Sequence, residues 1–160
     1  TTEALLNADQ ILVTGARSSY HAANWLGNRL NLLLGNTHII QEFYDPRFDL
    51  LNNITTKTVV LSIAFARYTK WTYHYAESAK KMGATLISIT DSVSSPFFNI
   101  SDCTILAAPI KDSMGFSSPI CMYCLFDVIT AKIHEERKDM VAERLKTYED
   151  TYRDFDMYYE

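Results

Sequence analysis

The sequence predicts an α/β fold in which a parallel β-sheet lies between two layers of helices. Short apolar, strand-forming runs alternate with helix-like segments along most of the 160 residues. The run at 58–64 is β-branched and apolar on both faces, which is typical of a central, buried strand. Because strands separated by helices pair in parallel through right-handed crossovers, we expect a doubly wound, three-layer α/β/α sandwich with extra C-terminal helices.

Five strands are expected in this sheet. The second one is short and is expected at an edge, whereas the third is expected at the centre. The runs QILVT, THIIQ, TVVLSIA, TLISIT and CTILA place the five strands at residues 10–14, 37–41, 58–64, 85–90 and 103–107.

Helices are predicted where apolar residues recur every three or four positions. Gly35 and Gly83 are expected to end the first helix and the helix at 68–82, since glycine suits the residue at which a helix stops. The segment at 119–131 is apolar on nearly every side and predicts a buried helix. A short helix is expected from Pro46 to about Ile54. The apolar positions of the first helix are Ala22, Leu26, Leu30 and Leu33. A final charged helix at about 136–157 carries Val141, Leu145, Tyr148, Tyr152 and Phe155 on one face.

Composition excludes several classes of function. The net charge of −4 argues against binding of DNA or RNA by this chain itself, because phosphate binding depends on clustered Lys and Arg. No apolar run reaches the ~18 residues of a membrane span, and no signal peptide is recognisable. A cytoplasmic location without membrane attachment is therefore expected.

The three cysteines are an odd number, which indicates free thiols in a reducing compartment. Cys121 and Cys124 form a C-x-x-C within the apolar segment, without a second pair or a fitting histidine. We interpret this pair mainly as part of a buried helix, with redox and metal-binding roles as the alternatives. No cofactor is expected.

Three polar loops follow strand ends, at 15–19, 65–69 and 91–96. Open parallel sheets bind ligands at the carboxyl ends of their strands, and hydroxyl and N–H groups at helix starts suit a phosphate or carboxylate. Arg17 and Arg67 can clamp such an anion. The alternatives are that the hydroxyl residues cap helices, that the arginines form surface ion pairs, or that Arg67 pairs with Asp91 and closes the pocket.

These loops also carry a family resemblance. ILVTGARSSYHAA, LSIAFARYTKWT and KKMGATLISITDSVSSPFFNISDCTIL resemble successive motifs of a SIS (sugar isomerase) domain. The combination G-A-R-S-S, F-x-R-Y-[ST] and I-T-D-S-x-x-S-P is similar to the ligand-binding half of RpiR-type transcription regulators. The resemblance implies one flavodoxin-like SIS domain over 1–160, with its core at about 5–135. It also implies a homodimer or higher homo-oligomer, and DNA binding only through an N-terminal helix-turn-helix domain that this sequence does not include.

The resemblance also indicates the site residues. The ligand-contacting hydroxyl of the first loop falls on Ser19, and Arg17 stands where the usual G-x-G-x-S pattern has its second glycine. The second loop usually reads S-x-S-G-x-[ST]; here both serines are alanines and the glycine is Arg67. The expected ligand-binding residues are Arg17, Ser18, Ser19, Arg67, Thr69, Thr90, Ser92 and Ser95.

The sequence therefore predicts an effector-sensing and dimerisation domain that binds a phosphorylated sugar or related anionic metabolite, such as a carboxylate, without catalysis. The alternative function is a SIS-type sugar-phosphate isomerase, which needs a general base. His21, one turn beyond the first loop, is the nearest candidate for that base. A purely structural dimerisation module is the third hypothesis.

Overall fold

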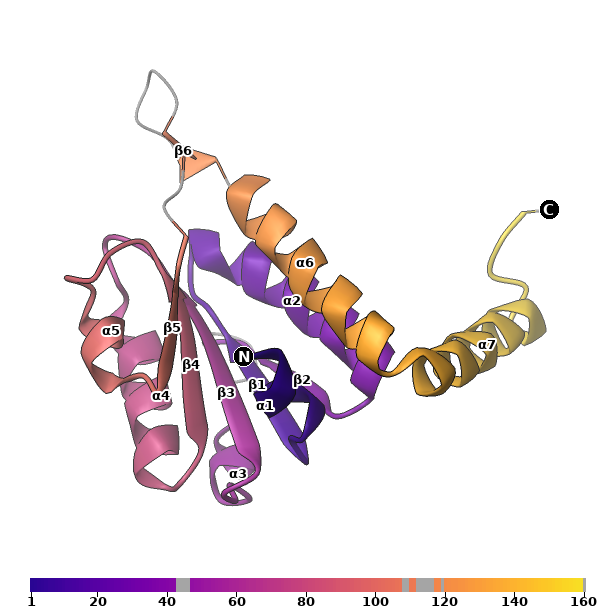
Figure 1. The fold of residues 1–160 in the computed structure, drawn as a ribbon, viewed down its shortest axis with the longest axis horizontal. Helices are drawn as coiled ribbons and strands as arrows, with labels where there is room; N and C mark the ends of the chain where they lie inside the picture. The colour runs from indigo at the N-terminus through magenta and orange to yellow at the C-terminus, as the bar shows by residue number, and fades with distance from the viewer. Residues whose placement is uncertain (43–46, 108–109, 112–116, 119, 160) are drawn as a thin grey trace.

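The five predicted strands are present and form one parallel sheet in the order β2-β1-β3-β4-β5 (Figure 1). The structure is a computed structural model that describes residues 1–42, 47–107, 110–111, 117–118 and 120–159. β2 lies at an edge and β3 at the centre, where all seven of its residues are buried. The strands span Gln10–Thr14 (β1), Thr37–Ile40 (β2), Thr58–Ala64 (β3), Thr85–Thr90 (β4) and Cys103–Leu106 (β5).

Helices cover both faces of the sheet, so the three-layer α/β/α architecture is confirmed. α2 and α6 lie on one face and α4 and α5 on the other, and each face has its own apolar core (Figure 1). The short helices α1 and α5 were not predicted. The helices span Thr2–Leu6 (α1), Ser18–Leu34 (α2), Phe48–Leu51 (α3), Lys70–Lys81 (α4), Pro96–Ile100 (α5), Ile120–Glu136 (α6) and Lys138–Asp154 (α7).

Several predicted helix ends are confirmed. Gly35 ends α2 in the left-handed conformation, at φ 80°, and Gly83 follows α4 at φ 106°. The short helix expected from Pro46 is α3, but Pro46 itself lies outside the described residues. α7 leads away from the sheet beyond α6, and its Arg144 donates to the carbonyls of Asn31 and Leu32 at the end of α2 (Figure 1). A cation at a helix C-terminus satisfies carbonyls that lack a partner within the helix.

The prediction that α6 is a buried helix was wrong for one of its sides. Met122, Phe126 and Ile133 pack into the core with α2, whereas Cys124 and Val128 are exposed, Val128 at 67%. α6 is an outer-layer helix, and of the residues that the structure describes, those outside α6 cover only its inner face. Apolar residues all round a helix therefore indicated burial that this chain alone does not provide.

A second, two-stranded antiparallel sheet pairs β6 (Ile110–Lys111) with β7 (Ser117–Ser118). Its two-residue strands carry no alternation that the sequence analysis could detect. Among the helices that the structure describes, none is both long and apolar enough to cross a membrane.

The strand order creates a switch point between β1 and β3. The chain goes outward from β1 to β2 and then crosses back to β3, so the connections after β1 and β3 leave toward opposite faces of the sheet. In open parallel sheets, loops that diverge in this way leave a crevice at the carboxyl ends of the strands.

Candidate anion-binding site

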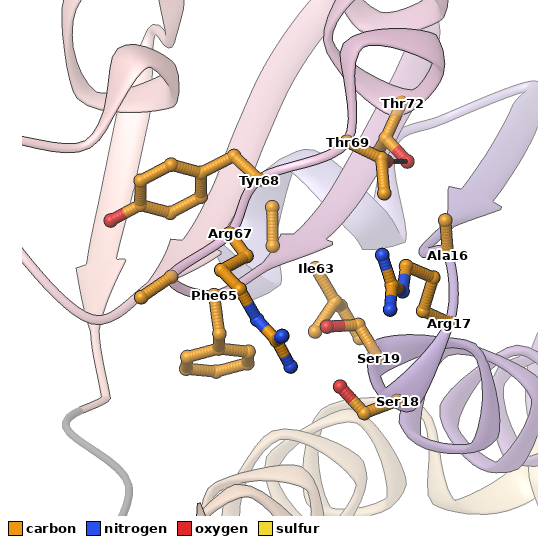
Figure 2. Close-up of a pocket in the computed structure, with 12 residues that line it drawn as sticks. Ala16, Arg17, Ser18, Ser19, Ile63, Phe65, Arg67, Tyr68, Thr69 and Thr72 are labelled. Atoms are coloured by element: carbon orange, nitrogen blue, oxygen red, sulfur yellow. Dashed lines mark hydrogen bonds between the residues drawn. The ribbon is translucent and has the colours of Figure 1, made fainter.

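A small pocket occupies this switch point, between the loop after β1 and the loop after β3 (Figure 2). The pocket is small, with a volume of about 40 Å³, and it is partly open to solvent. The pocket is lined by Ala16, Arg17, Ser18, Ser19, Ile63, Ala64, Phe65, Ala66, Arg67, Tyr68, Thr69 and Thr72.

Gly15 makes the first loop tight enough to bring the start of α2 to the pocket. A Cβ at Gly15 would lie 2.8 Å from the Ser19 carbonyl oxygen and 3.1 Å from that of Ile63. Both obstacles are backbone atoms, so no larger residue fits without moving the turn. As a result, Ser18 and Ser19 stand on the first turn of a 17-residue helix, where N–H groups and the helix dipole favour an anion.

Arg17 and Arg67 both adopt backbone conformations that ordinarily select glycine. Their φ angles are 56° and 66°, and a side chain in this region costs roughly 1–3 kcal/mol. These are the two positions at which the SIS motifs carry glycine. The chain therefore retains the glycine-type turns while adding a guanidinium group to each loop.

Both guanidinium groups face the pocket. Figure 2 shows them reaching toward the space where the hydroxyls of Ser18 and Ser19 also point. Within the described parts of the chain, neither arginine side chain has an ion-pair or hydrogen-bond partner, and both residues are exposed. The described lining contains no Asp or Glu, so the pocket has a net positive charge that suits an anion.

Asp91 supports the second loop from outside the pocket. Its carboxylate accepts hydrogen bonds from the Ala66 N–H at 3.0 Å and from the Tyr68 hydroxyl at 2.6 Å. Burial, together with the Asp91 carboxylate, raises the pKa of Tyr68, so the phenol stays protonated and donates to Asp91. Asp91 thus bonds to the loop itself and not to Arg67, and the expected alternative in which that pair closes the pocket is not seen.

The structure brings five of the predicted site residues together and leaves three apart. Arg17, Ser18, Ser19, Arg67 and Thr69 line the pocket. The Thr90 hydroxyl donates to Ser95 at 2.9 Å, and Ser95 accepts the Phe97 N–H and caps α5. Ser92 forms a hydrogen bond with Ser94 in the same turn. Ligand contacts by Thr90, Ser92 and Ser95 stay a prediction, since these three lie outside the described lining.

Sequence reasoning missed Tyr68 and Thr72 as site residues. The helix predicted at 68–82 included Tyr68, but α4 begins only at Lys70 and leaves Tyr68 in the loop. The Thr72 hydroxyl lies 2.6 Å from that of Thr69, one turn earlier, and both line the pocket. The i, i+3 spacing of two threonines at a helix start was the available signal.

Comparisons with known proteins agree with the fold of this chain. The family model of the SIS domain matches residues 4–131. Over 103 residues the chain is 29% identical to a glutamine–fructose-6-phosphate aminotransferase [isomerizing] of Thermococcus kodakarensis. That alignment covers 64% of this chain and 17% of the relative, so the chain spans only a small part of that enzyme's length.

Two solved structures resemble this chain along most of its length. The sugar isomerase domain of an RpiR transcription factor from Sphaerobacter thermophilus superposes with a TM-score of 0.85 at 24% identity, covering 93% of this chain and 83% of that one. The Vibrio vulnificus NanR protein, complexed with ManNAc-6P, has a TM-score of 0.83 at 17% identity, covering 96% of this chain and 59% of that one. At these identities the likeness establishes a shared fold.

Proposed function

The chain belongs to the SIS domain family, and on that premise we propose that it is the effector-sensing and dimerisation domain of an RpiR-type transcription regulator. Its ligand is a phosphorylated sugar or a related anionic metabolite. One observation carries the proposal. Two unpaired guanidinium groups, one from each loop, converge on the pocket together with the two serine hydroxyls at the start of α2. Among the structural neighbours, the domain of an RpiR transcription factor and the NanR protein complexed with ManNAc-6P support it.

The position of the pocket suggests how binding is sensed. Ser19 belongs to α2, which packs against α6 on one face of the sheet, whereas Thr69 precedes α4 on the other face. An anion held by both loops links these two layers at one point. The pocket is partly open to solvent, so a ligand whose anionic group lies between the loops can extend outward.

We infer that the pocket does not catalyse isomerisation. Moving a proton between adjacent carbons needs a base such as Glu or His, and the described lining contains neither. His21 lines a separate groove with Tyr148 and Tyr152 of α7. Its ring packs edge-on against the ring of Tyr20, with 5.8 Å between the ring centroids. The likeness to the domain of an RpiR transcription factor favours the same interpretation.

Calorimetric titration with hexose and amino-sugar phosphates tests the proposal. We expect saturable binding that Ser19→Ala weakens by about tenfold, because a hydrogen bond to a charged group contributes ~1.5–3 kcal/mol. Ser78→Ala, on α4 and outside the pocket lining, is the matched control and should bind as the parent does. In D₂O, NMR should show no deuterium at the substrate carbons. Absence of binding would refute the sensor, and deuterium incorporation would establish the isomerase instead.

Dimerisation forms part of the proposal. The outward face of α6 presents Cys124, Val128 and Ala131, which recur at helical spacing and are exposed in this chain. A second copy packed on this face would remove that apolar surface from water and would connect α2, through α6, to the partner. In a full-length regulator the DNA would be bound by a separate helix-turn-helix domain.

A further inference from the structure

The proposed function does not say which anionic metabolite binds, but the charges in the pocket narrow the choice. The neutral S-x-S-G-x-[ST] and G-x-G-x-S motifs offer hydroxyl and N–H donors at these positions. Here Ser19 and Thr69 retain hydroxyls and α2 retains its N-terminus. The anion-holding features of the neutral motif thus persist in part, and Arg17 and Arg67 add two full charges to them.

These two charges lack a counterion among the described residues. Neither guanidinium group has an ion-pair or hydrogen-bond partner there, and each extends from a backbone conformation that disfavours a side chain. Figure 2 shows the two groups entering the same space from different loops. At the same time Ala64 and Ala66 place methyl groups where the neutral motif has hydroxyls, so fewer neutral donors face a sugar.

We propose that the ligand carries two anionic groups. One is a phosphate that is held at the first turn of α2 and contacts one of the two arginines. The other is a carboxylate or a second phosphate, which pairs with the guanidinium group of the other arginine. The chemical class is therefore a phosphorylated sugar acid or a sugar bisphosphate, rather than a sugar monophosphate with an uncharged remainder. This inference rests on the proposed function, because it specifies the ligand of the same pocket.

Matched probe pairs that differ by one carboxylate test the inference. The pairs are glycerol 3-phosphate with 3-phosphoglycerate, and glucose 6-phosphate with 6-phosphogluconate. Titrations of the protein at low ionic strength are expected to show at least about tenfold tighter binding of the acid in one or both pairs, since a charge-assisted bond contributes ~1.5–3 kcal/mol. The pair with the larger ratio reports the spacing between the two anionic positions.

Glycine variants assign the effect to the two arginines. Arg17→Gly and Arg67→Gly restore the residue of the neutral motif and should each reduce the preference for the acid to below about threefold, within the range of a screened surface charge. Arg29→Ala removes a positive charge from α2 outside the pocket, where the guanidinium lies over Trp25, and should leave the preference unchanged.

The outcomes separate the two proposals. If the phosphates bind but the acid gains nothing in either pair, the two arginines clamp a single phosphate and this inference is overturned while the proposed function stands. If Arg29→Ala lowers the preference as much as the pocket variants do, the effect comes from the overall charge and the inference also fails. If none of the four compounds and no other sugar phosphate binds, both proposals fall.

Discussion

Arg17 and Arg67 combine an unfavourable backbone conformation with an unpaired charge, and each of these properties can be measured separately. A left-handed φ is open to glycine at no steric cost, whereas alanine keeps the Cβ that causes the strain. Strain at residues held in this way is commonly found at ligand sites, where the surrounding structure maintains it. The two arginines are thus expected to favour binding at the expense of stability.

For stability, Arg67→Gly should be more stable than Arg67→Ala by about 1 kcal/mol, which shifts the melting temperature by roughly 2–4 °C in a domain of this size. Arg29 provides the control because it lies inside α2, where glycine is less stable than alanine by about 1 kcal/mol. Thermal unfolding of the four variants measures both differences. If the alanine variant is the more stable one at position 67 as well as at position 29, the backbone of Arg67 is not strained.

At the scale of elements, two glycines let α2 approach the sheet closely, for different reasons. A Cβ at Gly15 would meet backbone oxygens, whereas a Cβ at Gly27 would lie 2.5 Å from a side-chain carbon of Ile39 on β2. Both Gly15→Ala and Gly27→Ala should destabilise the fold by roughly 1–3 kcal/mol, as overpacking does. Ile39→Ala should recover part of the loss for Gly27→Ala but none for Gly15→Ala, and equal recovery in urea unfolding would contradict this account.

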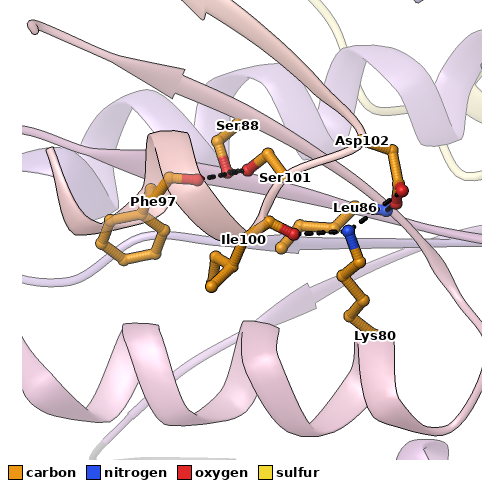
Figure 3. A network of polar contacts seen from close by, with 7 residues as sticks. All are labelled: Lys80, Leu86, Ser88, Phe97, Ile100, Ser101 and Asp102. Carbon is orange, nitrogen blue, oxygen red and sulfur yellow. Dashed lines mark hydrogen bonds and ion pairs between the residues drawn. The ribbon is translucent and has the colours of Figure 1, made fainter. Parts of the chain in front are cut away.

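A polar network joins α4, β4 and α5 to Ser101 and Asp102, which lie between α5 and β5 (Figure 3). The Asp102 carboxylate accepts from the Leu86 N–H at 2.9 Å and from the Lys80 ammonium at 3.0 Å, and Lys80 also donates to the Ile100 carbonyl at 2.6 Å. Burial alone would raise the pKa of Asp102, but the hydrogen bonds from Leu86 and Lys80 outweigh it and lower the pKa from its ordinary value.

A depressed carboxyl pKa stabilises the fold above the pKa of the unfolded chain, and the contribution disappears as the pH falls through the folded pKa. Asp102→Asn should therefore cost about 1 kcal/mol at pH 7, a small value because solvent screens this partly exposed pair, and less at pH 3. Urea unfolding at both pH values measures the change. Asp9→Asn, whose carboxylate lies 3.9 Å from Lys57, is the control and should have no comparable effect at either pH. A cost for Asp102→Asn that does not shrink at pH 3 would contradict the assignment.

The sequence patterns predicted the regular elements well because burial determines them. β3 is apolar on both faces and proved central, and the glycine signals placed the ends of α2 and α4. The short elements escaped prediction: α1 and α5 have five residues each and β6 and β7 two each, too few to show a period. For the site, the motifs identified the residues, but the φ angles and the free guanidinium groups depend on tertiary structure and needed coordinates.

At the scale of the whole molecule, the outer face of α6 is an apolar surface that the described residues leave exposed to solvent. Val128 is 67% exposed there, and Val93, in the loop after β4, is exposed to a similar degree at 60%. If two copies pack through α6, Val128→Asp should convert a dimer to a monomer, because a buried unpaired carboxylate is strongly disfavoured. Val93→Asp should leave the dimer intact. Sedimentation equilibrium at micromolar concentration tests this, and a parent protein that is already monomeric would contradict it.

The central claim is that an anion binds between the first turn of α2 and the loop after β3, in contact with Arg17 and Arg67. The most direct measurement is an NMR titration with inorganic phosphate that follows the backbone amides and the arginine Nε–H groups. We predict saturable shifts at the amides of residues 17–19 and 65–69 and at the Nε–H of Arg17 and Arg67, with no shift at the Nε–H of Arg29. Shifts confined to other arginines, or no saturable shift in these two loops, would contradict the account.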